Sequence, residues 1–285
     1  MANWYANLKY KFSAVNVIEK IIYINVAVFL LTYLFKTISS LMQFNGNAVI
    51  NWFALSPHFD SLVYKPWTII SYGFLHEGFI HILFNLIILF YIGNLFLDFF
   101  NRKQFLVYYF LGIFFGGLVF MISYNYFPAL KTREVYLVGA SAGVTSVLIG
   151  LASLIPNYPL RFRFIGNVKL MYIAIAMVAI DIIQIPNGNA GGHLAHLGGA
   201  LIGFLLTTKL NQGKNLILWM ENLLLNKQKS PLSTIHKRKK PNVKKEENST
   251  DRQKKIDEIL DKISKSGYEA LSQEEKDFLF KVGKE

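Results

Sequence analysis

Cysteine is absent from the 285 residues of this chain. The chain therefore has no disulfide framework and no thiolate metal site, and any nucleophile it carries is not a thiol. A signal peptide with a small-residue cleavage site is not evident either, because the first apolar run follows Lys9, Lys11 and Lys20. We expect that run to be a retained membrane anchor. Internal sequence repeats are also lacking.

Long apolar runs dominate what is present. Hydrophobic residues make up 53% of the chain, the mean hydropathy is +0.32, and the runs approach the roughly 20 residues that a helix needs to cross a bilayer. Backbone groups in lipid must be satisfied within a segment, so these runs are predicted to be helices. The six predicted spans are Ile21–Phe35, Ile80–Leu97, Phe105–Ile122, Ala140–Ile155, Leu170–Ile185 and His193–Thr208.

The net charge of +12 is concentrated on alternate connections between the spans. The basic groups are Lys9, Lys11 and Lys20 before the first span, Arg102 and Lys103 after the second, Arg161, Arg163 and Lys169 after the fourth, and Lys209 and Lys214 after the sixth. The opposite connections, including Ser40–Phe79 and Pro186–Gly192, carry few positive residues. By the positive-inside rule, the sequence predicts a multi-pass protein of the cell (inner) membrane with both termini cytoplasmic.

The tail changes composition after residue 208. Lys214–Asn226 has apolar residues at helical spacing, which is typical either of a helix on the cytoplasmic membrane face or of an extension of the sixth span. The basic run His236–Lys245 is predicted to be a linker held near anionic lipid headgroups. No aromatic or folded reader module surrounds this run, so nucleic acid is not expected as a partner.

The last segment is predicted to be a small helical hairpin. Ile256, Ile259 and Ile263 lie on one helix face, Gly267 suits the end of that helix, and Ser272-Gln273-Glu274-Glu275 is a capping-box pattern that opens another. The expected organisation is a cytoplasmic segment at 1–20, a six-span domain at 21–208, an interfacial helix and basic linker at 209–250, and a hairpin module at 251–285.

Four polar residues stand at the entrances of alternate spans. With the N-terminus inside, the second, fourth and sixth spans all begin at the outer surface, and their first turns contain His81 and Asn85, Ser141, and His196. Polar side chains in a membrane are costly and face the protein interior or a water-filled cavity. Their common depth predicts a shared polar site.

Spacing supports this prediction. His81 and Asn85 are four residues apart and share a helix face. The small residues Gly139, Gly143, Gly199 and Gly203 would allow two helix backbones to approach closely. We therefore expect the fourth and sixth spans to be neighbours, as a hydrogen bond between Ser141 and His196 requires.

These motifs, Gly139-Ala140-Ser141, Ala195-His196-Leu197-Gly198-Gly199 with Gly203, and His81-Ile82-Leu83-Phe84-Asn85, resemble those of rhomboid intramembrane serine proteases. The resemblance implies an all-α membrane protein with a six-transmembrane-helix rhomboid bundle, here followed by a cytoplasmic C-terminal helical tail. It implies that Ser141 is the catalytic nucleophile and His196 the general base, without metal or cofactor. The oxyanion would be held by Asn85, His81 and the backbone N–H of Ser141.

The resemblance also implies partners: transmembrane proteins, single-span ones in particular, cleaved near the outer membrane boundary, within a lipid environment. His76 and Trp67 match positions in the first loop of the family. Two positions depart from the family pattern. Ala142 follows the serine where glycine is usual, and Thr68 follows Trp67 where many members have arginine.

The motif around Ser141 also resembles that of another class of hydrolase. Gly139–Gly143 also fits the G-x-S-x-G elbow of soluble hydrolases, and Ser141, Asp181 and His196 are in the chain order of that triad. The elbow requires a strand and a parallel sheet, which these apolar helices do not provide. Asp181 is therefore expected to line the cavity, cap a helix or pair with a polar neighbour, and Asp181→Asn to leave most activity.

A metal centre is not expected. His76-Glu77 and His81 have the wrong interval for H-E-x-x-H, although His193 and His196 could share a helix face. His76 and His193 taken singly are interpreted as interhelical hydrogen-bond partners, and Trp67 as an interfacial anchor. A transporter would show paired broken helices or midplane charges. A catalytically inactive rhomboid-like protein that binds transmembrane helices stays open as the alternative function.

Overall fold

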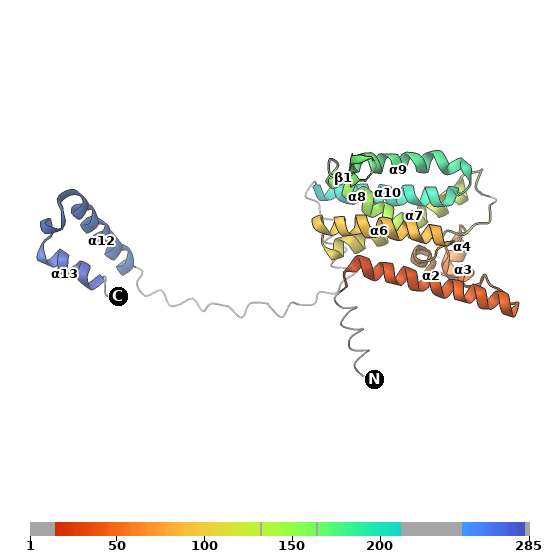
Figure 1. Cartoon of the computed structure of the whole chain (residues 1–285), viewed down its shortest axis with the longest axis horizontal. Coiled ribbons are helices and arrows are strands. Elements are labelled where there is room, and N and C mark those ends of the chain that lie inside the picture. Colours follow the sequence, from red (N-terminus) through yellow and green to blue (C-terminus); the bar gives the residue numbers. More distant parts are fainter. Residues whose placement is uncertain (1–14, 132, 164, 212–246, 283–285) are drawn as a thin grey trace, which may run out of the picture. The chain divides into compact units, whose positions relative to one another are not determined.

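The computed structural model describes residues 15–131, 133–163, 165–211 and 247–282 (Figure 1). The chain divides into two compact units, Met1–Asn226 and Lys227–Glu285. The predictions for Lys214–Asn226 and for the basic run His236–Lys245 lie outside the described residues.

Each of the six predicted spans coincides with a helix of the first unit. Within the residues that the structure describes, five helices are long and apolar enough to cross a membrane. They are α2 (Val17–Met42), α6 (Phe79–Phe99), α7 (Arg102–Tyr126), α9 (Leu170–Gln184, continued by the 3-10 turn η2 at Ile185–Asn187) and α10 (Ala190–Asn211). The sixth, α8 (Ser141–Leu154), is apolar but has 14 residues. At about 1.5 Å per residue it measures about 21 Å, less than the roughly 30 Å of a hydrocarbon core. The chain is thus an all-α membrane protein in its main architecture.

Capping residues set where two of the long helices begin. The Asn16 side chain accepts from the Glu19 N–H, and the Glu19 carboxylate accepts from the Asn16 N–H, so α2 begins before the predicted Ile21. Asn101 and Gln104 form the same reciprocal pair ahead of α7. These side chains satisfy N–H groups that a helix start leaves unpaired.

The long connection between α2 and α6 is folded. It contains α3 (Ala48–Phe53), α4 (Phe59–Tyr64), α5 (Thr68–Ser71) and the 3-10 turn η1 (Tyr72–Phe74). Trp67 Nε1 donates to the carbonyl of Trp52 at 2.8 Å, and the two indoles stack. Tyr72 Oη donates to the carbonyl of Ile113 on α7 at 2.6 Å. The connection is therefore held both to itself and to the helix bundle.

The centre of the bundle is α8, which lies among α6, α7 and α10 (Figure 1). Its residues 142–152 are all buried. Glycines on the neighbours make room for it: a Cβ on Gly112 of α7 would meet the Ser146 side chain, and one on Gly203 of α10 would meet the Ser146 carbonyl. Short length and a buried central stretch identify α8 as a core helix of the bundle.

A short hairpin departs from the helical architecture. β1 (Pro159–Phe162) and β2 (Gly166–Lys169) pair antiparallel between α8 and α9, with Leu160 opposite Val168. This hairpin carries Arg161 and Lys169, two of the basic residues that the sequence places on a connection between spans.

The second unit contains α12 (Glu247–Ser266), the 3-10 turn η3 (Tyr268–Ala270) and α13 (Gln273–Val282). Gly267, at φ 79°, follows the end of α12 as predicted. The predicted capping box is also present, because the Ser272 N–H donates to Glu275 Oε2 and the Glu275 N–H donates to Ser272 Oγ. The Ser272 N–H, and then Lys262, lower the pKa of the Glu275 carboxyl.

Candidate active site

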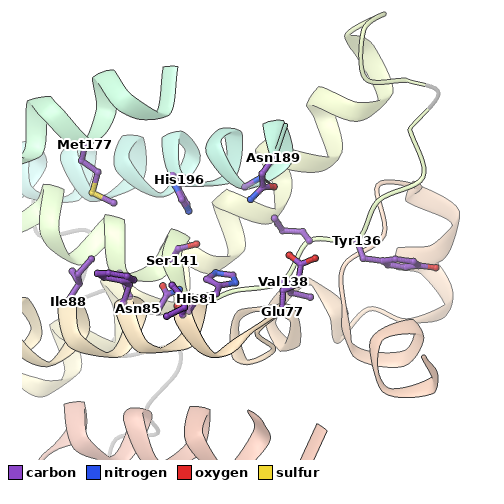
Figure 2. A pocket seen from close by; sticks show the side chains of 15 residues that line it. Glu77, His81, Asn85, Ile88, Tyr136, Val138, Ser141, Met177, Asn189 and His196 are labelled. Carbon is purple, nitrogen blue, oxygen red and sulfur yellow. Dashed lines mark hydrogen bonds between the residues drawn. The ribbon is translucent and has the colours of Figure 1, made fainter. Parts of the chain in front are cut away.

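A cavity of about 440 Å³ opens near the N-terminal ends of α6, α8 and α10 (Figure 2). Its polar lining includes all four residues that the sequence singled out, His81, Asn85, Ser141 and His196. The rest of its lining is Glu77, Ile80, Phe84, Ile88, Tyr136, Leu137, Val138, Val144, Met177, Asn189 and Gly192. We call this space the polar cavity.

Ser141 is the first residue of α8. The strand-like segment before it is fixed by backbone bonds: Leu137 pairs with Leu55 in both directions, and the Gly139 N–H donates to the Tyr72 carbonyl at 3.0 Å. The first N–H groups of an α-helix have no intrahelical acceptor, and the helix dipole makes this end positive. The Ser141 hydroxyl therefore lies beside donors suited to an anion.

Gly139 brings His81 close to Ser141. Its φ of +128° is a conformation that favours glycine. A Cβ at this position would lie 2.9 Å from Cε1 and Nε2 of His81 and 3.5 Å from Ser141 Oγ. The absent side chain thus lets the imidazole of His81 pack directly against the backbone that leads into α8.

Asn85 lies one turn after His81 and is buried. Its Nδ2 donates to the carbonyl of His81 at 2.9 Å. A side-chain amide has two N–H donors, so this bond holds the amide while leaving one donor available to the polar cavity.

His196 enters the polar cavity from α10, and Figure 2 shows it on the Ser141 side of that helix. Because α10 begins at Ala190 rather than at the predicted His193, His196 lies in the second turn instead of the first. Among the described residues, no hydrogen bond joins Ser141 Oγ to the His196 ring. His196 instead forms a hydrogen bond with Asp181 of α9, whose Oδ1 lies 2.8 Å from His196 Nδ1.

The predicted neighbourhood of the fourth and sixth spans is confirmed, because α8 and α10 pack against each other. The glycines do not all contribute as expected. Gly199 and Gly203 of α10 lie against α8 backbone, but Gly143 faces α7, where a Cβ would lie 2.8 Å from the Tyr109 carbonyl, and Gly139 faces His81.

Ala142, the departure beside Ser141, is accommodated by its neighbours. Its methyl group faces Gly116 of α7, where a Cβ would lie 2.6 Å away, and its carbonyl faces Gly199 of α10. Glycine on both flanking helices leaves the space that the extra methyl group occupies, and Ala142 is 1% exposed.

The remaining sequence candidates do not line the polar cavity. His76 is buried and packs edge-on against His81, with ring centroids 5.2 Å apart. Trp67 joins the loop to α3 through its hydrogen bond to the Trp52 carbonyl. His193 makes the interhelical hydrogen bond expected of it, from Nδ1 to Asp181 Oδ1 at 2.8 Å.

Asp181, His193 and His196 also form a group that could hold a metal ion, since their ligand atoms lie within 4.8 Å of one another. The sequence indicated the shared face of His193 and His196 but not its third member. Hydrogen bonds between the carboxylate and both rings already account for this arrangement.

Sequence reasoning missed several residues of the cavity wall, among them Glu77, Tyr136 and Asn189. Each is in or beside an irregular segment, where sequence periodicity does not indicate which side chains point into the cavity. It also missed the contact of Asp181 with the two histidines, although chain order had drawn attention to Asp181.

Comparison with known proteins matches residues 64–212 to the Rhomboid domain. The chain belongs to the rhomboid family. Residues 242–284 match a second model, a family of unknown function (DUF6576). The rhomboid match covers the polar cavity and the helices α6 to α10 that surround it.

Three relatives illustrate the range of the family. RHOMBOID-like protein 12, mitochondrial, of Arabidopsis thaliana is 27% identical over 158 residues, 52% of this chain and 47% of its own length. Inactive rhomboid-related protein 2 of Caenorhabditis elegans is 28% identical over 169 residues, 56% of this chain and 45% of its own length. Rhomboid-like protease 3 of Toxoplasma gondii is 27% identical over 160 residues, 56% of each chain. This rhomboid thus spans about half the length of these relatives.

Proposed function

We propose that this rhomboid is an intramembrane serine endopeptidase that cleaves peptide bonds in transmembrane segments of other membrane proteins. The observation that carries the proposal is that Ser141, His196, His81 and Asn85, from three different helices, line one cavity. The relative named as a protease is consistent with it.

The proposed reaction is acyl transfer by a serine and a histidine. His196 takes the proton from Ser141 Oγ as that oxygen attacks the substrate carbonyl, and it then donates the proton to the leaving amine. The acyl-enzyme is released by water that enters from the polar cavity. Positioned proton transfer of this kind contributes about 10²–10⁴-fold to a rate.

The negative charge that develops on the substrate oxygen would be held at the start of α8. The Ser141 N–H, the second amide proton of Asn85 and the His81 ring are the proposed donors. Preorganised donors are effective because they already point toward the oxygen when its charge develops. The N-terminal end of the helix adds a favourable field for an anion.

The proposed substrates are single-span proteins, cut near the outer boundary of the membrane, with the surrounding lipids as the other partners. We propose that the rhomboid lies in the cell (inner) membrane with both termini cytoplasmic. The proposed division of the chain stays as the sequence suggests, with the proteolytic domain at 21–208 and a separate module at 251–285. Short α8 would place Ser141 below the membrane surface, at the depth where a substrate helix unwinds.

The test is labelling by a serine-directed fluorophosphonate, together with cleavage of a single-span substrate in liposomes. Wild type is expected to be labelled and active, and Ser141→Ala and His196→Ala to lose both properties. Ser153→Ala is the matched control, because Ser153 also lies on α8 but donates to the Ile149 carbonyl. His58→Ala, in the first loop, controls for loss of a histidine. Labelling that survives Ser141→Ala would place the nucleophile elsewhere.

The alternative function is a catalytically inactive protein that binds transmembrane helices, as the name of the Caenorhabditis elegans relative allows. It predicts that wild type is neither labelled nor active, while a transmembrane helix carrying a photocrosslinker still attaches to it. Ser141→Ala would then crosslink as well as wild type.

A further inference from the structure

One carboxylate oxygen of α9 contacts two histidines of α10. Asp181 Oδ1 lies 2.8 Å from His193 Nδ1 and 2.8 Å from His196 Nδ1. The two histidines are three residues apart on one helix, so their rings reach the same oxygen from successive turns. The carboxylate therefore fixes both rings through the same ring atom.

Asp181 lies deep in the protein, with 4% of its surface exposed. Its second oxygen, Oδ2, is buried and has no hydrogen-bond partner in the described part of the chain. A buried acidic group in a membrane helix is costly and marks function more often than packing. Asp181 is also not part of the cavity lining, so it contacts His196 from behind rather than reaching the reacting atoms.

The contact determines which nitrogen of His196 carries the proton. A carboxylate oxygen accepts hydrogen bonds, so each ring presents Nδ1–H to Asp181. In a neutral imidazole the other nitrogen, Nε2, is then the acceptor. A general base needs this tautomer, because Nε2 must be unprotonated to receive the proton of a hydroxyl that lies on the side of the ring away from Asp181.

We propose that Asp181 is a positioning residue for His196: it holds the ring in the Nδ1–H form, with Nε2 free for Ser141, and offsets the positive charge that the ring gains during attack. The inference rests on the proposed function. The proton moves from Ser141 Oγ to His196 Nε2 and then to the leaving amine, and Asp181 stays ionised throughout. His193 is the second donor that keeps the carboxylate oriented.

Two substitutions of Asp181 separate the hydrogen bond from the charge. Asp181→Leu is close in size but accepts nothing, so both rings lose their partner. Asp181→Asn keeps an acceptor oxygen without the charge. A soluble triad loses about 10⁴-fold in kcat when its acid is replaced by asparagine, and we expect about 10²-fold or more for Asp181→Leu. For Asp181→Asn we also expect about 10²-fold or more, because the neutral amide can turn an N–H toward the ring and favour the wrong tautomer.

The contact therefore changes the expectation drawn from the sequence, that Asp181→Asn would leave most activity. KM is expected to change by less than about threefold in both variants, because Asp181 does not line the cavity that binds substrate. Asp98→Leu, an exposed acid at the end of α6, is the control for removing a carboxylate and is expected to leave kcat unchanged.

The ¹⁵N NMR spectrum of the histidine rings distinguishes the positioning role from a purely structural one, because only the positioning role predicts a change of tautomer. In protein labelled with ¹⁵N-histidine, the His196 signals, assigned by their loss in His196→Gln, should report Nδ1–H in wild type. They should report a shift toward Nε2–H in Asp181→Leu. Thermal unfolding of each variant identifies any that fail to fold. If Asp181→Leu does not fold, the test uses Asp181→Asn, which has the same shape as the wild-type side chain.

The possible outcomes are distinct. A lower kcat with the tautomer shift supports the positioning role. Unchanged kcat in folded Asp181→Leu overturns it, even if Ser141→Ala and His196→Ala are inactive and the proposed function stands. Activity that survives in those two variants overturns the proposed function itself. Activity that is lost with a chelator and restored by Zn²⁺ would make the Asp181 group a metal site and overturn the positioning role.

Discussion

A Cβ atom on Gly199 of α10 would clash with the carbonyl oxygen of Ala142 of α8. This close contact brings the backbones of α8 and α10 together beside the polar cavity, since Ala142 directly follows Ser141 and Gly199 is three residues after His196. The separation between the Ser141 hydroxyl and the His196 ring therefore depends on a position that has no side chain of its own.

Gly199→Ala is expected to destabilise the rhomboid. The new methyl group must displace α8 backbone, and overpacking of this kind costs about 1–3 kcal/mol. We expect a lower thermal midpoint and reduced proteolysis, measured in detergent and in liposomes. Gly78→Ala is the matched control, because a Cβ there meets nothing within 4 Å. A wild-type midpoint for Gly199→Ala would show that the two helices are not packed as described.

Asn85→Ala is expected to lower kcat by about 10²–10³-fold, the usual effect of removing one oxyanion donor. KM should change little, because the donor acts on charge that develops after binding. Asn94→Ala is a matched control on the same helix. Asn94 Nδ2 also donates one turn back, to the Phe90 carbonyl at 2.7 Å, but Asn94 does not line the polar cavity. Equal activities of the two variants would remove Asn85 from the reaction.

His76, in the loop before α6, should make stability depend on pH. Burial, and then repulsion from His81, lower the pKa of His76 from 6.5 to about 4. Between these values the unfolded chain binds more protons than the folded one, so stability falls as pH decreases from about 6.5 to about 4. At about 1.4 kcal/mol per pH unit, the full effect is about 3 kcal/mol.

His76→Leu keeps the site apolar and removes this titration. The stability of wild type relative to His76→Leu should therefore fall by about 3 kcal/mol as the pH decreases from about 6.5 to about 4, whatever the difference between their thermal midpoints at pH 7.5. The same pH dependence in both proteins would mean that His76 is not responsible for it.

The proposed orientation in the membrane can be tested by labelling single introduced cysteines, because the wild-type chain has no cysteine of its own to be labelled. Lys131→Cys lies between α7 and α8, and Lys103→Cys lies at the opposite end of α7. A membrane-impermeant maleimide should label Lys131→Cys in intact cells and Lys103→Cys only after permeabilisation. The reverse pattern would invert the proposed topology.

Much of the candidate site could be predicted from the sequence, because its residues are brought together by their common depth in the membrane. Hydropathy located the helices, and counting from their starts placed His81, Asn85, Ser141 and His196 near one level. Local signals also predicted the Ser272 capping box. The helix starts were less accurate, as for α10, because caps and preceding turns rather than hydropathy determine where a helix begins.

Sequence alone determined that this chain is a helical membrane protein with polar residues at the entrances of three helices. Composition and helical periodicity act over a few residues, so they can be read without knowing the fold. Tertiary structure alone decided that Asp181 reaches His193 and His196, that Gly143 faces α7, and that Ala142 fits between Gly116 and Gly199. These contacts depend on how each helix is rotated about its axis when it packs, which is set by all its neighbours together.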